Sequence, residues 1–422
     1  MIQVVVIIAG FILYVTYKTR KTKVPHTDWQ RFRRKGAVPL DSVACNELQG
    51  VYTVTEGKEI FGNCCIVKWT YTIEKEGPVN HLSFFGGKEG AFIICEGRLD
   101  GNDILLKGAW RQLTASDTGT VQLVIRSSTL HEAGPKKGLS IEGYYGKKEE
   151  PPRESLRFTY DQPIPEKKPL DILAHRGGAR NVDFLSTSEN SLEMMKMAAR
   201  LGANGIEIDV RLTKDKVPVI IHDSFLSIHT FNNLLYDGLI SNHTLAELKA
   251  KELRKGGHIP TLQEALHTVL YNTPLEIVWL DIKKECDLGE IRALQMEYMQ
   301  KANEAGRKLT IYIGIPDKTI LGCFRALEDH LQLPSLTELE PEVAEAINAN
   351  AWAPQYTGGF QAEEVQLMQT QGRKAYVWSL DDAAMIHLYV KQGGFDGIVT
   401  NAPPVAFHTY YMPEGINVTA NE

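Results

Sequence analysis

The chain has 422 residues, more than one ordinary hydrophobic core accommodates, so we expect at least two domains. Its 43% hydrophobic and 23% charged residues exclude a largely disordered chain. The formal net charge of -6 argues against a nucleic-acid partner, because nucleic-acid binding usually needs a basic domain.

The N-terminal residues form an apolar run, IQVVVIIAGFILYVTY at 2–17, close to the lower limit of about 17 residues for a membrane-spanning helix. Lys18, Arg20 and Lys21 follow the run, whereas a secretory signal peptide carries its basic residues before it. The positive-inside rule then places the rest of the chain in the cytoplasm. We therefore expect residues 1–23 to be a single-pass transmembrane anchor, with the remaining domains on the cytoplasmic side of the membrane.

Residues 24–44 continue the basic character, with Arg31, Arg33, Arg34 and Lys35. Each basic residue near an anionic membrane surface gains about 1 kcal/mol of attraction. This basic linker is therefore either a membrane-contacting segment or a plain solvated connection.

The six cysteines form no spacing that is typical of a disulfide framework or a zinc site. A chain of this length does not need disulfides to fold. We expect reduced, structural thiols, which favours a reducing compartment.

Residues 45–163 contain short runs rich in β-branched and aromatic residues, separated by turn residues such as Gly86-Gly87 and Asp100-Gly101. The runs span 50–56, 64–75, 81–86, 91–99, 103–110, 120–127, 139–146 and 155–160. Short strands spaced about ten residues apart predict an antiparallel barrel or sandwich. A barrel of eight strands could hold one small apolar ligand; the alternative is a packed structural module.

Residues 164–422 alternate apolar strands with amphipathic helices, which predicts a parallel sheet covered on both faces. The strand candidates are 170–176, 204–212, 275–283, 309–315, 374–380 and 395–401, with weaker ones near 333–337 and 349–353. The helix candidates are 192–202, 261–270, 288–306 and 363–372. This pattern and length predict a TIM barrel. The alternative is an open doubly wound sheet, but no glycine-rich phosphate loop follows the first strand.

Acidic residues stand inside two of these apolar strands. Glu207 and Asp209 lie two apart, so their side chains share one face, and Asp281 belongs to the next strand, with Lys283 on its face. Neighbouring buried carboxylates repel each other, and a divalent cation removes that repulsion. Oxygen ligands favour Mg²⁺, Ca²⁺ or Mn²⁺ over zinc.

His175 and His222 end apolar strands, where the catalytic groups of a TIM barrel gather. Either histidine alone would more often be structural. Together they can divide general base and general acid roles near neutral pH, while Arg176 would neutralise charge on a phosphoryl group.

These motifs, in this order and spacing, resemble the glycerophosphodiester phosphodiesterase family. The shared residues are His175-Arg176-Gly177, Glu189-Asn190, Gly202-Ala203, Ile206-Glu207 with Asp209-Val210, Thr213 with Asp215, Val219 with His222-Asp223, Pro260-Thr261-Leu262 with Glu264-Ala265-Leu266, Trp378, and Asp396-Gly397-Ile398 with Thr400-Asn401. The resemblance covers 170–405 and leaves residues 1–163 without a recognised family.

The resemblance implies a TIM barrel with a defined set of site residues. The acid/base pair would be His175 and His222, the metal ligands Glu207, Asp209 and Asp281, and the substrate-binding residues Arg176, Lys283, Glu189 and Trp378. The sequence departs from the family at Asp281, where glutamate is common, at Lys216, where glycine is usual, and at Ser191, where threonine is common.

The expected function is metal-dependent hydrolysis of a glycerophosphodiester to glycerol 3-phosphate and an alcohol. One alternative is a lysophospholipase D or sphingomyelinase D-like activity on a membrane lipid, for which the anchor would bring the site to a lysophospholipid substrate. The other is a non-catalytic, membrane-tethered binding protein.

Overall fold

The computed structural model of the chain describes residues 36–115, 117–126, 138–183, 185–232, 236–284 and 287–413, together with Gly10. The predicted anchor and most of the basic linker lie outside the described residues. In the part that is described, no helix has both the length and the hydropathy that a membrane crossing requires.

The first domain is a closed barrel of antiparallel strands. Its strands are β2 (Gly50–Glu56), β3 (Cys64–Glu74), β4 (Gly77–Gly86), β5 (Phe92–Asp100), β6 (Asp103–Arg111), β7 (Thr118–Ile125), β8 (Ser140–Lys147) and β9 (Glu154–Gln162). Each strand pairs with the next one along the chain, and β9 pairs with β2, which closes the ring. A short strand β1 (Val38–Pro39) adds to β5. The predicted antiparallel domain is confirmed, and it is a barrel rather than a sandwich.

Side chains fill the interior of this barrel. The short helices α2 (Ser42–Glu47) and α3 (Lys58–Phe61) contribute buried residues to it. The ring of Phe61 packs edge-on against Trp110 and Tyr145, at centroid distances of 5.8 and 6.1 Å. The described residues therefore form a packed core, and they do not support an interior that holds an apolar ligand.

The second domain is a TIM barrel. Its parallel strands are β10 (Asp171–Ala174), β11 (Gly205–Leu212), β15 (Ile277–Ile282), β16 (Thr310–Ile315), β17 (Ser335–Thr337), β18 (Ala351–Trp352), β19 (Lys374–Val377) and β20 (Gly397–Thr400). Strand β10 pairs with both β20 and β11, so the sheet closes. The TIM-barrel prediction is confirmed, and the open-sheet alternative is wrong because the sheet has no free edge at β10.

Helices surround this sheet. They are α5 (Leu192–Arg200), α7 (Leu262–Asn272), α8 (Gly289–Glu304), α9 (Lys318–Arg325), α10 (Pro341–Ala346), α11 (Ala362–Thr370), α12 (Ala383–Lys391) and α13 (Pro403–Tyr411). A small subdomain between β11 and α7 holds β12 (Pro218–Ile220), β13 (Phe225–Ser227), β14 (Tyr236–Leu239) and α6 (Leu245–Lys249). Its strand β12 pairs antiparallel with β11, which places the subdomain beside the carboxyl end of that strand.

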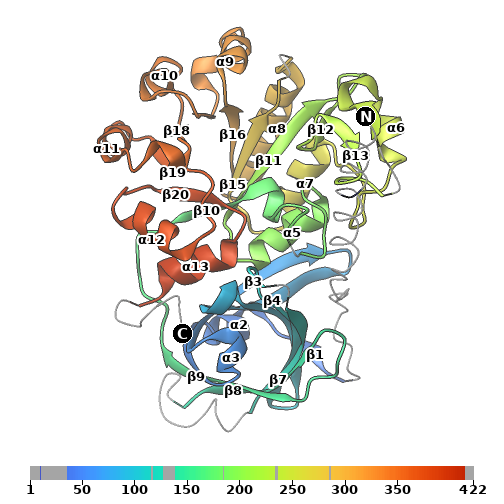
Figure 1. Cartoon of the computed structure of the whole chain (residues 1–422), viewed down its shortest axis with the longest axis vertical. Helices are drawn as coiled ribbons and strands as arrows, with labels where there is room; N and C mark the ends of the chain where they lie inside the picture. Colours follow the sequence, from blue (N-terminus) through green and yellow to red (C-terminus); the bar gives the residue numbers. More distant parts are fainter. Residues whose placement is uncertain are drawn as a thin grey trace.

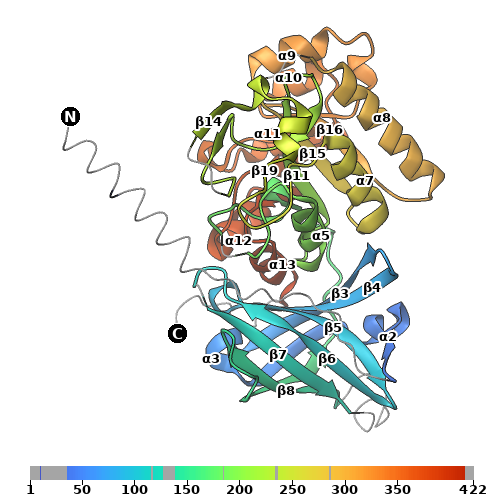
Figure 2. The same cartoon turned by 90° about the vertical axis from the view of Figure 1, so that its right-hand side faces the viewer.

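The two domains pack directly against each other, with β3 and β4 beneath α5 and α13 (Figures 1 and 2). Phe85 of β4 is buried, lies 5.1 Å from the ring of Phe407 in α13, and belongs to the same buried cluster as the TIM-barrel core. Arg200 and Lys196 of α5 form ion pairs of 3.3 and 2.9 Å with Glu74 of β3. The outer face of the antiparallel barrel, which includes Phe85, therefore shares a buried hydrophobic core with the TIM barrel, while the interior of the antiparallel barrel forms a separate cluster.

The described cysteines differ from the expectation in one place. Cys45, Cys64, Cys65 and Cys95 are free thiols, but Cys323 is disulfide-bonded. The expectation of reduced thiols throughout is wrong at Cys323, and the inference to a reducing compartment loses its support there, because disulfides persist mainly in oxidising environments.

Candidate active site

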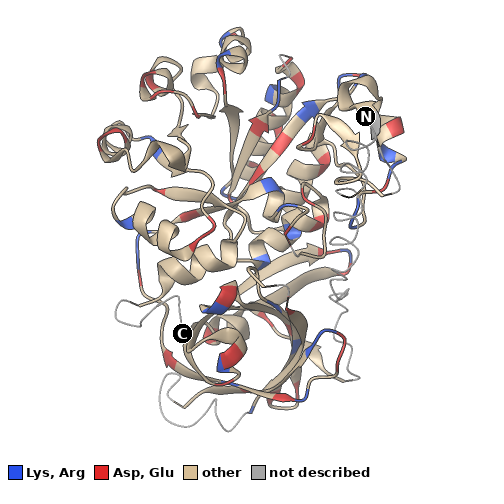
Figure 3. Ribbon diagram, in the orientation of Figure 1, with Lys and Arg blue, Asp and Glu red and all other residues tan. Residues whose placement is uncertain are grey.

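Three carboxylates converge at the carboxyl end of the TIM barrel. Glu207 and Asp209 come from β11, and Asp281 comes from β15, where the strand register sets Asp209 opposite Asp281. One ligand oxygen from each of the three side chains lies within 4.8 Å of the others. Figure 3 shows charged residues along both strands. We call these three residues the carboxylate cluster.

The carboxylate cluster has the donor set that a hard divalent cation needs. Glu207 Oε1 and Asp281 Oδ1 are buried and accept no hydrogen bond from the described residues, whereas the buried Asp209 Oδ1 has Lys283 Nζ 3.0 Å away. A buried acceptor without a donor is costly, and one cation can satisfy neighbouring carboxylate oxygens together. The residues present therefore fit a bound Mg²⁺, Ca²⁺ or Mn²⁺ ion.

Lys283 is the counter-charge inside this group. Its Nζ lies 3.0 Å from Asp209 Oδ1 and also contacts Asp281. Burial alone would raise the pKa of Asp209, but Lys283, together with His222, Arg176 and the hydrogen bond from Asn190, holds that pKa below its ordinary value. Burial lowers the pKa of a lysine, but these carboxylates raise the pKa of Lys283 above its ordinary value. Sequence reasoning assigned Lys283 to the substrate; the structure places it against the carboxylate cluster.

The other two carboxyl groups bind protons more tightly than usual. Burial, followed by the charges of Asp209 and Asp281, raises the pKa of Glu207 well above its ordinary value. Burial also raises the pKa of Asp281, against the opposing effect of Lys283. One lysine does not compensate three buried carboxylates, so the cluster retains protons when no cation is bound.

His175 follows β10 directly and is fixed in one tautomer. Asn401 donates its side-chain amide to Asp381 at 2.8 Å, which turns its Oδ1 toward His175 Nδ1 at 2.7 Å. The proton therefore sits on Nδ1, and Nε2 is left as an acceptor 3.7 Å from Glu207. Burial lowers the pKa of His175 to about 4, so this imidazole is neutral at pH 7.

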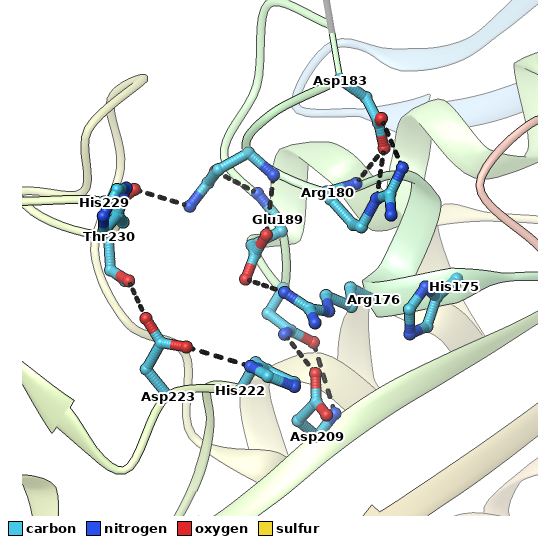
Figure 4. Close-up of polar contacts among 12 residues, drawn as sticks. His175, Arg176, Arg180, Asp183, Glu189, Asp209, His222, Asp223, His229 and Thr230 are labelled. Carbon is cyan, nitrogen blue, oxygen red and sulfur yellow. Dashed lines mark hydrogen bonds and ion pairs between the residues drawn. The ribbon is translucent and has the colours of Figure 1, made fainter. Parts of the chain in front are cut away.

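His222 follows β12 and has a different partner. Its Nδ1 lies 3.0 Å from Asp223 Oδ1, and Thr230 donates to the other oxygen of Asp223 at 3.1 Å (Figure 4). The hydrogen bond from His222 lowers the pKa of Asp223. A carboxylate held against Nδ1 stabilises a protonated imidazole, so the two histidines have distinct electrostatic environments.

Arg176 occupies a left-handed backbone conformation, with φ of 52°, which is uncommon for a residue with a side chain. This conformation lets its backbone N–H donate to Glu207 Oε2 at 2.9 Å. Its guanidinium binds Glu189 at 3.0 Å, and the other oxygen of Glu189 accepts from the backbone of Asn181 at 2.7 Å. Glu189, assigned to the substrate from the sequence, thus contacts Arg176 and acts to position it.

Trp378 directly follows β19 (Lys374–Val377). Its indole N–H donates to the carbonyl of Ala353 at 3.0 Å, and its half-buried ring packs on the apolar residues inside the TIM barrel. Its assignment to the substrate stays a prediction.

The structure adds supporting residues that were not assigned a role from the sequence. Asn190 donates to Asp209 Oδ2 at 2.7 Å, and Asn401 and Asp223 position the two histidines. All three lie within the motifs quoted in the sequence analysis, so their membership of those motifs could have identified them as site residues. Glu338, directly after β17, had no such signal because that strand was weakly predicted; burial and the charge of Asp281 raise its pKa to about 8.

Comparisons with known proteins show which family this chain resembles. The model of the glycerophosphoryl diester phosphodiesterase family matches residues 175–405. A curated relative from Caldanaerobacter subterraneus, a glycerophosphodiester phosphodiesterase, is 29% identical over 55% of this chain and 94% of its own length. The rat glycerophosphodiester phosphodiesterase 1 is 28% identical over 36% of this chain and 48% of its own, so the chain spans about half the length of that relative.

Among solved structures, a glycerophosphodiester phosphodiesterase from Parabacteroides distasonis aligns with a TM-score of 0.45 at 23% identity. The alignment covers 56% of this chain and 95% of that one.

Proposed function

The chain belongs to the glycerophosphoryl diester phosphodiesterase family, and we propose that its TIM barrel hydrolyses a glycerophosphodiester to glycerol 3-phosphate and an alcohol. The observation that carries this proposal is the group of three converging carboxylates at the carboxyl end of the TIM barrel, in which Glu207 Oε1 and Asp281 Oδ1 are buried and accept no hydrogen bond from the described residues, with His175 Nε2 3.7 Å from Glu207.

Glu207, Asp209 and Asp281 would hold the divalent cation, which supplies positive charge to neutralise the phosphoryl oxygens. Arg176 adds a second positive group, aimed by Glu189. Such preorganised charge is commonly the largest contribution to catalysis of this kind.

The two histidines divide the proton transfers in the proposed reaction. His175, neutral with a free Nε2 lone pair, suits the general base that takes a proton from the attacking oxygen, either water or the neighbouring 2-hydroxyl of the glycerol. His222, whose Nδ1 lies 3.0 Å from the carboxylate of Asp223, suits the general acid that protonates the departing alkoxide as the P–O bond breaks. With water as the nucleophile, proton exchange with solvent returns both histidines to their starting states. With the 2-hydroxyl, a cyclic phosphate forms first, and water activated by His222 then opens it while His175 returns its proton to the 2-oxygen.

The test uses the protein from residue 24 onward, with glycerophosphocholine and a lysophospholipid compared in the presence and absence of a chelator. We expect release of glycerol 3-phosphate that stops on chelation and returns with Mg²⁺, Ca²⁺ or Mn²⁺. Full turnover after exhaustive chelation would overturn the metal-dependent mechanism. Hydrolysis of the lysophospholipid alone would favour the lysophospholipase D alternative.

We also propose that residues 1–23 anchor the chain with the two barrels in the cytoplasm, on the strength of the basic residues after the apolar run. The disulfide at Cys323 argues for the opposite side. Protease added to intact cells should leave residues 45–422 uncut, and their digestion without permeabilisation would overturn the orientation.

A further inference from the structure

The interior of the TIM barrel is built in layers, because alternate residues of each strand point inward. Trp279 of β15 and Leu336 of β17 belong to the buried cluster inside the sheet. The next inward positions toward the carboxyl ends of these strands are Asp281 and Glu338. The backbone N–H of Glu338 donates to the carbonyl of Ile315 at 3.1 Å, so the strand pairing continues to this residue. Glu338 therefore lies in the same layer as Asp281 of the carboxylate cluster.

The carboxyl group of Glu338 is half-buried and has no hydrogen-bond or ion-pair partner among the described residues. Burial and the charge of Asp281 raise its pKa, whereas Lys283 lowers it, so this group lies within electrostatic reach of the carboxylate cluster. A carboxyl oxygen accepts a hydrogen bond from a hydroxyl group in either protonation state. Glu338 is thus an acceptor at the barrel mouth that the described residues leave without a donor.

The indole of Trp279 is an unpaired donor in the same region. Trp279 is 2% exposed, and its Nε1 has no hydrogen-bond partner among the described residues. The indole lies against Gly314 of β16, where an added Cβ atom would come within 2.5 Å of Trp279 Nε1. Gly314 pairs with Asp281 on one side and with Leu336 on the other. The unpaired donor therefore lies against the strand that separates Asp281 from Glu338.

The strand order determines which arm of a bound diester reaches these two groups. Strands β12, β11, β15, β16 and β17 follow one another across the sheet. Because the carboxylate cluster is on β11 and β15, His222 after β12 and Glu338 after β17 lie on opposite sides of it. In the proposed reaction His222 protonates the departing alcohol. The glycerol arm then extends away from His222, toward β16 and β17.

We infer that Glu338 and the indole N–H of Trp279 bind the terminal hydroxyl of the glycerol arm. A hydroxyl group is both donor and acceptor, so one hydroxyl satisfies the carboxyl oxygen and the indole N–H together. The terminal hydroxyl is free for this role whether water or the 2-hydroxyl attacks phosphorus. Neither residue belongs to the motifs quoted in the sequence analysis. The inference rests on the proposed function, because it assigns substrate specificity to the same site.

The experiment measures kcat/KM for glycerophosphocholine and for 2-hydroxypropyl phosphocholine, which lacks only the terminal hydroxyl. The variants are Glu338→Leu, Glu338→Gln and Trp279→Phe, with Glu342→Leu at an exposed position of α10 as the matched control. All assays use the full chain at a saturating concentration of its activating cation.

We expect wild-type protein to prefer glycerophosphocholine by about tenfold or more, because the analogue leaves both polar groups unpaired. Glu338→Leu and Trp279→Phe should each lower kcat/KM for glycerophosphocholine about three- to tenfold, the effect of one lost hydrogen bond, and leave the value for the analogue unchanged. Glu338→Gln keeps an acceptor and should retain most of the preference, and the Glu342 control should match wild type.

The outcomes separate this inference from the proposed function. If neither diester is hydrolysed, the proposed function fails. If wild-type protein hydrolyses both diesters equally well, the inference is wrong and the proposed function stands, and this comparison does not depend on the folding of any variant. If Glu338→Leu and Trp279→Phe lower kcat/KM equally for both diesters, the two groups bind water or stabilise the barrel, and the inference is again wrong.

Discussion

Glu207→Gln tests the carboxylate cluster most directly, because it removes one charge and keeps the shape of the side chain. Two unit charges 4.8 Å apart, the upper limit within the cluster, repel by about 3.5 kcal/mol at an effective dielectric constant of about 20. Three ionised carboxylates would thus carry at least about 10 kcal/mol of repulsion. Lys283 contacts Asp209, at 3.0 Å, and Asp281, so its charge offsets repulsion at those two carboxylates and leaves Glu207, whose pKa is raised well above its ordinary value, as the least compensated of the three.

The incomplete charge compensation of the carboxylate cluster predicts that Glu207→Gln changes stability in opposite directions with and without a bound metal ion. Burial and the charges of Asp209 and Asp281 raise the pKa of Glu207 well above its ordinary value, so without a cation the uncharged glutamine should leave stability unchanged or slightly higher. With a cation at 100 times its Kd, wild-type protein gains about 2.7 kcal/mol. An unfolding entropy of about 2.1 cal/mol/K per residue over 422 residues converts this gain to a Tm increase of about 3 °C.

The assay is thermal unfolding of wild type, Glu207→Gln and the exposed control Glu363→Gln, each in chelator and in Mg²⁺, Ca²⁺ or Mn²⁺. Wild type and the control should show the increase in Tm, and Glu207→Gln should lose it. An undiminished metal-dependent increase in Glu207→Gln, or no increase in wild type with any of the three cations, would refute the reasoning.

Three further predictions concern catalysis, pH and the domain interface. Replacing His175 or His222 with alanine should lower kcat by at least about 100-fold; a variant that folds and keeps near wild-type kcat would make that histidine structural. Because two carboxyl groups of the cluster have raised pKa values, cation binding must release protons, so calorimetry should show affinity that rises with pH. Without metal, in chelator, stability should instead fall as pH rises, because a carboxyl group whose pKa is higher in the folded than in the unfolded protein loses its stabilising proton between those two pKa values. A stability that does not change with pH would contradict the raised pKa values. Phe85→Ala, which removes the contact with Phe407, should destabilise both barrels by about 3–5 kcal/mol in one calorimetric transition, whereas Tyr144→Ala, at an exposed position, should not; two separate transitions in wild type would refute a shared core.

The strands could be predicted because the apolar residues that become buried recur in recognisable runs along the sequence. The run 275–283 is continuously apolar apart from its charged residues, and β15 (Ile277–Ile282) is buried on both faces. Strand β18 (Ala351–Trp352) is only two residues long, so its periodicity is too short to be distinguished from a loop. The short helices inside the antiparallel barrel were missed for the same reason.

The cluster could be predicted because two carboxylates two apart on an apolar strand need a partner of opposite charge. The contacts of Lys283 and Glu189 with other side chains could not be predicted, because a basic or acidic residue near a phosphate site gives the same sequence signal whether it touches substrate or another side chain. In the structure Lys283 lies 3.0 Å from Asp209 and Glu189 lies 3.0 Å from Arg176, and their assignment to the substrate stays a prediction.

The shared core between the barrels was not predictable either, and it changes what the first barrel does. Strand β4 carries Ser83 and Phe85 on its outer side, and in sequence these resemble any half-buried strand. In the structure Ser83 donates to the carbonyl of Arg200 at 2.6 Å, at the end of α5, the helix whose N-cap residue, Ser191, directly follows Asn190. Because Asn190 donates to Asp209, the first barrel supports the helix whose N-terminal end positions a cluster carboxylate. The packed interior of the first barrel and its contact with α5 therefore favour a role in which the first barrel supports the TIM barrel over one in which it binds an apolar ligand.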